Sequence, residues 1–80
     1  MQVLRTIDTN ITIEVNGEPF LCTIRFYKWA LNDLIEYLNF DKNLILIEYN
    51  NKVIDTLSLK NILLQDQDKI EIITLVGGGI

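Results

Sequence analysis

The chain has 80 residues, of which 49% are hydrophobic, and carries a formal net charge of -4. This length allows one domain with a small core, and the acidic balance argues against a nucleic-acid binder, which needs a basic surface. The sequence contains no histidine and one cysteine, so it lacks the usual general base, an internal disulfide and a thiolate metal cluster.

The N-terminal residues 1–10 carry no clear pattern, and we expect an N-terminal extension or an extra strand there. We place the domain at 11–76 and a flexible glycine-rich tail at 77–80. Met1 is not followed by a signal peptide, and no apolar run approaches the roughly 20 residues of a membrane helix. We therefore expect a soluble intracellular protein with no membrane partner.

A β-hairpin is predicted for the first clearly patterned segment. Ile11, Ile13 and Val15 alternate with polar residues, which is typical of a half-buried strand. Asn16-Gly17 follows, and both residues tolerate a positive φ. The returning strand is expected at 20–26 after Pro19, with one apolar face made of Phe20, Cys22, Ile24 and Phe26.

One amphipathic helix is predicted at about 29–39. Leu31, Leu34, Ile35 and Leu38 have the spacing of one apolar stripe, and the polar residues Asn32, Asp33 and Glu36 are expected off that stripe. The apolar run 44–49 then predicts a buried central strand. Asn50-Asn51 predicts a turn, and Val53-Ile54 a short paired segment.

The segment 57–64 is less regular, and we expect a brief helical turn with Leu57, Leu59 and Leu63 pointing inward. Asp66-Gln67-Asp68 is interpreted as a solvated turn, and 69–76 as the last strand. In that strand Ile70 and Ile72 share one face, and Ile73 and Leu75 share the other. Whether this second face is covered or exposed is left open by the pattern.

The order of elements predicts an α+β fold, with one main helix packed across a mixed sheet of four to five strands. The last strand would lie between the hairpin and 44–49 if the fold is ubiquitin-like. Periodicity alone does not fix that strand order. Isolated small sheets pair at their edges, so a monomer or a weak dimer is expected.

Few residues suit catalysis. Cys22 lies on an apolar face and is interpreted as a small hydrophobe whose thiol pKa is raised. Asp66 and Asp68 lack the glycine and distal glutamate of an EF-hand calcium loop. Tyr27-Lys28-Trp29 is the only aromatic and basic cluster of the kind that single-stranded nucleic acids bind, and packing at the helix entrance explains it at least as well. The glycine-rich terminal run 76–80 is either a frayed end or linker, or a bare backbone that suits threading into another enzyme, where a terminal glycine carboxylate would be unhindered.

Several segments together resemble the ThiS family of sulfur carriers in thiamine biosynthesis. They are Asn16-Gly17-Glu18, 31–38, 45–50, Asp68-Lys69-Ile70-Glu71-Ile72 and Val76-Gly77-Gly78-Gly79. The resemblance covers about 11–79 and implies a ubiquitin-like β-grasp fold. It also implies that the chain is a protein co-substrate rather than an enzyme, with no bound cofactor or metal.

In that family the E1-like enzyme ThiF adenylates the terminal glycine with ATP. Sulfur then replaces AMP to give a thiocarboxylate, and the thiazole synthase ThiG consumes it. The resemblance implies that Gly79 bears the sulfur and that Gly77 and Gly78 form a flexible lead. It further implies that Val76, Leu75 and Ile73 contact the partners, and that the compartment is the bacterial cytoplasm or the plastid stroma.

Two features depart from the family pattern. Ile80 follows Gly79, so Gly79 has no free carboxylate until Ile80 is removed, unless Ile80 is an artificial addition or the chain is not competent. Gln67 stands where the family usually has glycine. Two alternatives remain open: a sulfur carrier of the molybdopterin-synthase small-subunit type, and a non-catalytic ubiquitin-like interaction domain with an inert tail.

Overall fold

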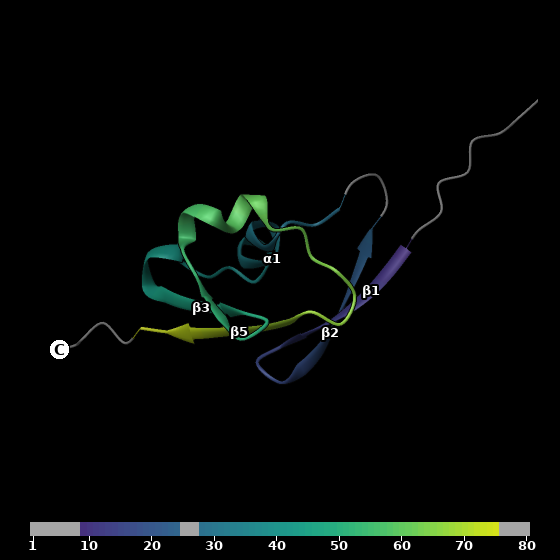
Figure 1. Cartoon of the computed structure of the whole chain (residues 1–80), viewed down its shortest axis with the longest axis horizontal. Coiled ribbons are helices and arrows are strands. Elements are labelled where there is room, and N and C mark those ends of the chain that lie inside the picture. The colour runs from purple at the N-terminus through teal and green to yellow at the C-terminus, as the bar shows by residue number, and fades with distance from the viewer. Residues whose placement is uncertain (1–8, 25–27, 76–80) are drawn as a thin grey trace, which may run out of the picture.

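A computed structural model describes residues 9–24 and 28–75 of the chain. These residues form a five-stranded mixed sheet in the order β2-β1-β5-β3-β4, and the helices lie on one side of it (Figure 1). The elements are β1 (Thr9–Val15), β2 (Glu18–Ile24), α1 (Leu31–Tyr37), the 3₁₀ helix η1 (Lys42–Leu44), β3 (Ile45–Tyr49), β4 (Lys52–Ile54), the 3₁₀ helix η2 (Thr56–Asn61) and β5 (Lys69–Thr74).

The predicted hairpin is confirmed. Asn16 and Gly17 have φ angles of 51° and 83°, as a tight hairpin turn between twisted strands requires. Strand β1 already includes Thr9, and β2 starts at Glu18 rather than at residue 20. Pro19 lies in β2, an edge strand with one free side, where a missing N–H is tolerated. The expectation for residues 1–8 lies outside the described residues.

The predicted helix is present but shorter than 29–39. It begins after Ala30, whose N–H donates to the Asp33 carboxylate at 2.8 Å, and the chain leaves it through Asn39 at φ 64°. Leu31, Leu34 and Ile35 of the apolar stripe are buried as expected, and Leu38 is partly buried. Asn32 was expected off the stripe but is only 6% exposed. The segment after η2 runs along the start of the helix, where the Leu31 N–H donates to the Ile62 carbonyl, so more than one side of α1 is enclosed.

The strand β3 was predicted to be a buried central strand; it is paired on both sides within the sheet, but only one of its faces is buried. Ile45 and Ile47 are buried, whereas Leu46 is exposed, because the helices pack on the other face of the sheet. The turn at Asn50-Asn51 is confirmed by φ angles of 49° and 72°. The short paired segment at 53–54 is confirmed as β4.

The expected helical turn in 57–64 is η2, but two of its three predicted inward residues point elsewhere. Leu59 is fully buried, whereas Leu57 is 86% exposed and Leu63 is 47% exposed. Leu57 and Leu59 are two residues apart, which places them on different sides of a 3₁₀ helix with three residues per turn, and Leu63 lies beyond the end of η2. Asp55 caps this helix by accepting from the Leu57 N–H at 2.9 Å.

The last strand, β5, lies between β1 and β3, as the resemblance implied. It runs parallel to β1 and antiparallel to β3, so it is paired on both sides. Ile70 and Ile72 face the core as expected. The core lies between this sheet and the helices, and its buried apolar members are Ile11, Ile13, Cys22, Leu31, Leu34, Ile35, Ile45, Ile47, Leu59, Leu64, Ile70 and Ile72.

The turn before β5 is confirmed, but its two carboxylates differ. Asp66 is exposed, and its Oδ1 accepts from the Thr12 N–H at 2.8 Å, which lowers its pKa. Asp68 was expected to be solvated and is only 8% exposed. Its Oδ2 accepts from the Tyr49 hydroxyl at 2.5 Å and from the Gln65 N–H at 2.8 Å. A buried carboxylate needs such partners, and the sequence pattern did not reveal them.

Asn50, the residue after Tyr49, completes this network from the same end of β3. Its Nδ2 donates to Asp68 Oδ1 at 3.1 Å, and its Oδ1 accepts from the Lys69 N–H at 2.8 Å. The start of β5 is therefore fixed to the end of β3 by side-chain hydrogen bonds.

The glycine preferred by the family at position 67 has a backbone explanation. Gln67 adopts φ 73°, a left-handed conformation that costs a residue with a Cβ about 1–2 kcal/mol. We expect Gln67→Gly to raise the free energy of unfolding by about 0.5–1 kcal/mol, after the larger unfolded-state entropy of glycine is subtracted. Urea denaturation measures this change. Gln67→Ala keeps the Cβ, and an equal gain in that variant would contradict the explanation.

Tyr49 gives a pH-dependent contribution to stability. Burial, with the hydrogen bond to Asp68 and its charge, raises the pKa of Tyr49 to about 12. The folded state therefore holds this proton more tightly than the unfolded state. The contribution is fully present below about pH 10 and is lost as the pH rises toward 12.

We expect Tyr49→Phe to cost about 1 kcal/mol at neutral pH, because one hydrogen bond to a buried carboxylate is lost. It should also make the decline in stability above pH 10 shallower than in the wild type. Denaturation at several pH values tests both effects. Tyr37→Phe, at a 67% exposed site, is the matched control and should leave the decline unchanged.

Candidate functional site at the end of the central strand

The two described residues of the predicted site lie where β5 ends. Ile73 is the second-to-last residue of β5, and Leu75 directly follows the strand. Their side chains are 45% and 49% exposed. The open question about the second face of β5 is thereby answered, since both side chains are exposed in the described structure. Val76, Gly77, Gly78 and Gly79 lie outside the described residues.

Strand β5 is held on its β1 side beyond the end of β1 itself. The Asn16 N–H donates to the Ile70 carbonyl at 2.9 Å. The Asn16 side chain then takes the place of the next residue of β1, because its Oδ1 accepts from the Ile72 N–H at 2.7 Å and its Nδ2 donates to the Ile72 carbonyl at 3.3 Å. The hairpin turn thus anchors β5 up to Ile72.

The other side of β5 is paired even further along the chain. Leu46 lies opposite Ile73, and the Leu75 N–H donates to the Leu44 carbonyl at 2.7 Å. Leu75 is therefore aligned by β3 and by the residue that precedes it, although it follows the last residue of β5. These bonds fix the direction in which the chain leaves the sheet.

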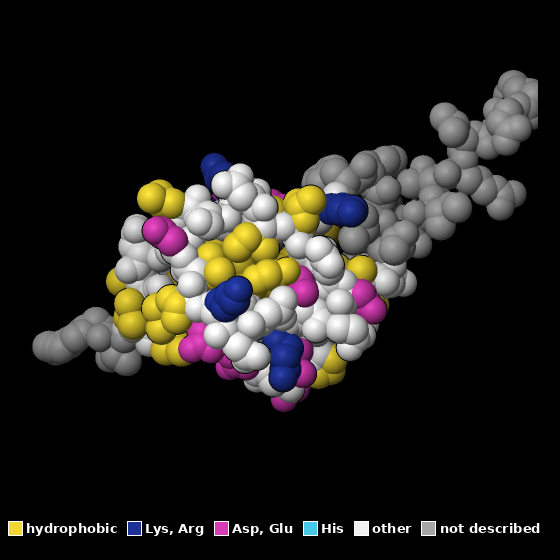
Figure 2. Space-filling view, viewed as in Figure 1, with side chains coloured by type: hydrophobic (Ala, Val, Ile, Leu, Met, Phe, Trp, Pro, Cys, Tyr) yellow, Lys and Arg dark blue, Asp and Glu magenta, His cyan; other side chains and the backbone are white. Residues whose placement is uncertain are grey.

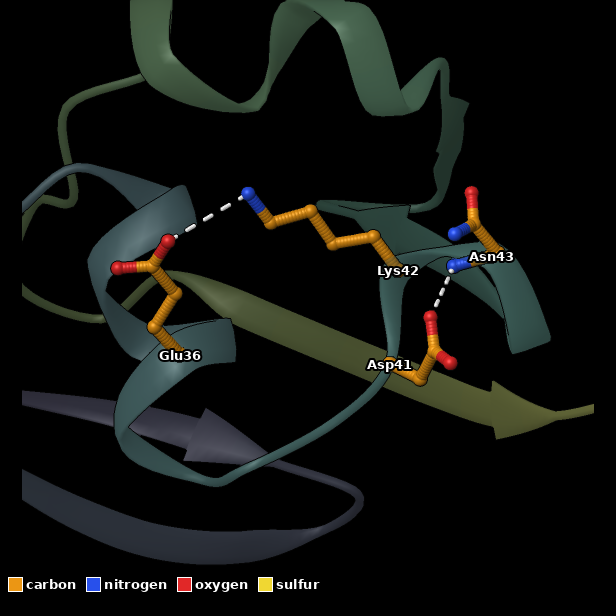
Figure 3. Close-up of polar contacts among 4 residues, drawn as sticks. All are labelled: Glu36, Asp41, Lys42 and Asn43. Atoms are coloured by element: carbon orange, nitrogen blue, oxygen red, sulfur yellow. Dashed lines mark hydrogen bonds and ion pairs between the residues drawn. The ribbon is translucent and has the colours of Figure 1, made fainter.

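Leu44 is positioned by the connection between α1 and β3 (Figure 3). Asp41 starts η1 by accepting from the Asn43 N–H at 2.9 Å, and the Leu44 N–H donates to the Asp41 carbonyl at 2.9 Å. The Lys42 ammonium lies 3.5 Å from the Glu36 carboxylate of α1. This ion pair is exposed and contributes little stability, but the capped turn defines where β3 begins.

Four exposed apolar side chains gather at this end of the sheet, and we call them the apolar patch: Leu44, Leu46, Ile73 and Leu75. They form two neighbouring cross-strand pairs, and each is between 37% and 49% exposed. Figure 2 shows hydrophobic side chains gathered at the end of the molecule where β5 terminates. Clustered exposed apolar residues of this kind mark a docking surface. Leu44 and Leu46 were not predicted as site residues, because their exposure depends on which face the helices cover.

The other chemical candidates in the described residues do not form a site. Cys22 is 1% exposed and burial raises the pKa of its thiol, as predicted for a core cysteine. Trp29 packs edge-on against Tyr37 with ring centroids 5.7 Å apart, and its Nε1 donates to the Thr23 carbonyl at 3.2 Å. This explains its place at the helix entrance, and Tyr27 lies outside the described residues.

The described segments 9–24 and 28–75 hold neither a metal-binding cluster nor a membrane-spanning helix. No three acidic, cysteine or histidine side chains there converge on a point where a metal ion would be held. The described helices are also too short to cross a bilayer.

A solved structure shares the fold. The thiamine biosynthesis protein (ThiS) from Geobacter metallireducens matches with a TM-score of 0.67 at 22% sequence identity, and the match covers 86% of this chain and all of the other. At this identity the likeness shows the fold alone. The ubiquitin-like β-grasp expectation is confirmed by it and by the strand order.

Two similar sequences cover almost the whole chain. They are uncharacterized proteins called ycf40 from Porphyra purpurea and Pyropia yezoensis, with 42% and 40% identity over 73 residues. Each match spans 91% of this chain and 99% of the relative. The sequence model described as ThiS family matches residues 29–79, which is more than half of the chain. The chain therefore belongs to the ThiS family.

Proposed function

We propose that this chain is a sulfur carrier that donates sulfur for the thiazole ring of thiamine. In this role it is a protein co-substrate, and other enzymes carry out the chemistry on its C-terminal glycine. The observation that carries the proposal is the extent of the family match, which runs through Gly77, Gly78 and Gly79 and stops before Ile80.

The structure supplies a base for such a tail. The segment before the glycines leaves from a strand that is paired on both sides and aligned by Leu44 as far as Leu75. A rigid body with a bare backbone extension would deliver its terminal carboxylate into a narrow active site, because glycine has no Cβ to obstruct it. The docking surface and the tail would then engage the same partner.

The reaction itself would take place at Gly79. Its carboxylate attacks the α-phosphorus of ATP on ThiF, which releases pyrophosphate and leaves a mixed anhydride with AMP. A hydrosulfide-level donor then attacks the acyl carbon and expels AMP to give the thiocarboxylate, and ThiG transfers that sulfur to the thiazole. ATP is bound by the activating partner, so the carrier needs no cofactor of its own. We propose the bacterial cytoplasm or the plastid stroma as the compartment, since ATP is available in both.

The tail is the first feature to test. We expect a chain that ends at Gly79 to support ATP–pyrophosphate exchange with ThiF and, with a sulfur donor, to gain the mass of one oxygen-to-sulfur exchange. The full chain should do neither, because Ile80 occupies the carboxylate of Gly79. Incorporation of labelled pyrophosphate into ATP measures the exchange, and intact mass spectrometry measures the oxygen-to-sulfur gain. Protein purified from its native source should lack Ile80 and include a thiocarboxylate fraction.

The same experiment separates the alternatives. A thiocarboxylate that ThiG does not consume, but a molybdopterin-synthase large subunit does, would assign the chain to that pathway. Two results together would contradict the carrier function and favour an interaction domain. They are the absence of exchange in the chain that ends at Gly79 and the presence of Ile80 in the native protein.

The apolar patch is tested by a double variant, Ile73→Ser with Leu75→Ser. Both side chains are about half exposed, so the stability of the fold should change by less than about 1 kcal/mol. Losing two apolar contacts should raise the KM for the carrier in the exchange reaction by at least about tenfold. Leu57→Ser, at an 86% exposed site on η2, is the control and should leave KM unchanged. An unchanged KM in the double variant would exclude the patch as the docking surface.

A further inference from the structure

We propose that the partner which docks on the apolar patch places an arginine or lysine against Glu48 and Glu71. This inference rests on the proposed function, because it takes the E1-like adenylyltransferase as that partner. Beyond the proposed function, the inference names the kind of side chain that the partner contributes and where on the sheet that side chain binds.

Glu48 and Glu71 lie directly opposite each other on β3 and β5. Along the same face, the next cross-strand pair is Leu46 with Ile73, and the one after it is Leu44 with Leu75. Successive residues on one face of a strand are about 7 Å apart. The open face thus presents two apolar pairs followed by one acidic pair, all at the end where the tail begins.

The acidic pair is unfavourable for the isolated sheet. Two like charges directly opposite in an antiparallel pair repel each other at a Cβ separation of about 5 Å. Within the described residues the one ion pair joins Lys42 to Glu36, so no described cation pairs with Glu48 or Glu71. Lys69 lies on the same face but is in register with Glu14 on β1 and opposite Asn50.

A basic side chain from the partner would relieve this repulsion. A guanidinium group spans two carboxylates with its several N–H donors, and the neighbouring apolar contact would exclude water from the pair. The chain carries a net charge of -4, so a basic surface on the partner would also be attracted from a distance. Acidic side chains lie beside the hydrophobic group at this end of the molecule in Figure 2. The expected partner surface is apolar with a cation about 7 Å from the apolar contact.

The test compares two double variants of the full chain: Glu48→Gln with Glu71→Gln, and the control Glu18→Gln with Glu36→Gln. Both remove two charges, but Glu18 and Glu36 lie on β2 and α1 rather than on β3 and β5, and the exposed ion pair of Glu36 with Lys42 contributes little stability. Binding to the E1-like adenylyltransferase from the same organism is measured by calorimetry at low and at high salt. Thermal unfolding is measured in parallel.

We expect the Kd of the Glu48/Glu71 double variant to rise about tenfold at low salt and the difference to shrink at high salt. Its thermal midpoint should stay the same or increase, because a repulsion is removed. The control should bind like the wild type. A Kd equal to that of the wild type, an equal loss in the control, or no binding by the wild type would each overturn the inference.

The proposed function is tested separately, by measuring pyrophosphate exchange with the chain that ends at Gly79. If the chain that ends at Gly79 supports exchange but the Glu48/Glu71 double variant binds like the wild type, only the docking inference is overturned. Charge-dependent binding by the wild type without exchange would support the docking inference and contradict the carrier function.

Discussion

Strand β5 is hydrogen-bonded to β1 on one side and to β3 on the other, and the rest of the fold is arranged around it. Its two core residues, Ile70 and Ile72, are buried beneath the helices. This strand joins elements that are far apart in the sequence, because β1 begins the described chain and β5 ends it. The residues that follow β5 therefore leave from a position that depends on nearly every other contact.

Two asparagines secure β5 where regular pairing stops. Asn16 extends the pairing with β1 by one residue through its side chain, and Asn50 binds the N–H of Lys69 at the start of the strand. Both have positive φ angles and both end a strand, so the same residues that turn the chain also hold β5. Asparagine suits this double role, because it tolerates the left-handed conformation and its amide resembles a peptide group.

The sheet has two different faces, and this asymmetry underlies the proposed function. One face is covered by α1 and η2 and forms the core. The other presents the apolar patch and, beside it, Glu48 and Glu71. A small carrier must be recognised by more than one enzyme while its own chemistry is confined to the tail. In the proposed function, the open sheet face at the end of β5 would provide recognition while the chemistry takes place on the tail.

The sequence by itself determined the local elements: Asn16-Gly17 specified the hairpin, the leucine spacing specified α1, and the alternation at 69–75 specified β5. These follow from interactions between near neighbours. The resemblance to a family, rather than periodicity, supplied the strand order and the proposed role of Gly79. Only the tertiary structure decided that Asp68 is buried, that Leu57 and Leu63 are exposed, and that Leu44 and Leu46 join Ile73 and Leu75 in one patch. Those outcomes depend on which face of the sheet the helices cover, and a residue's own neighbours in the sequence do not encode what packs against it from a distance.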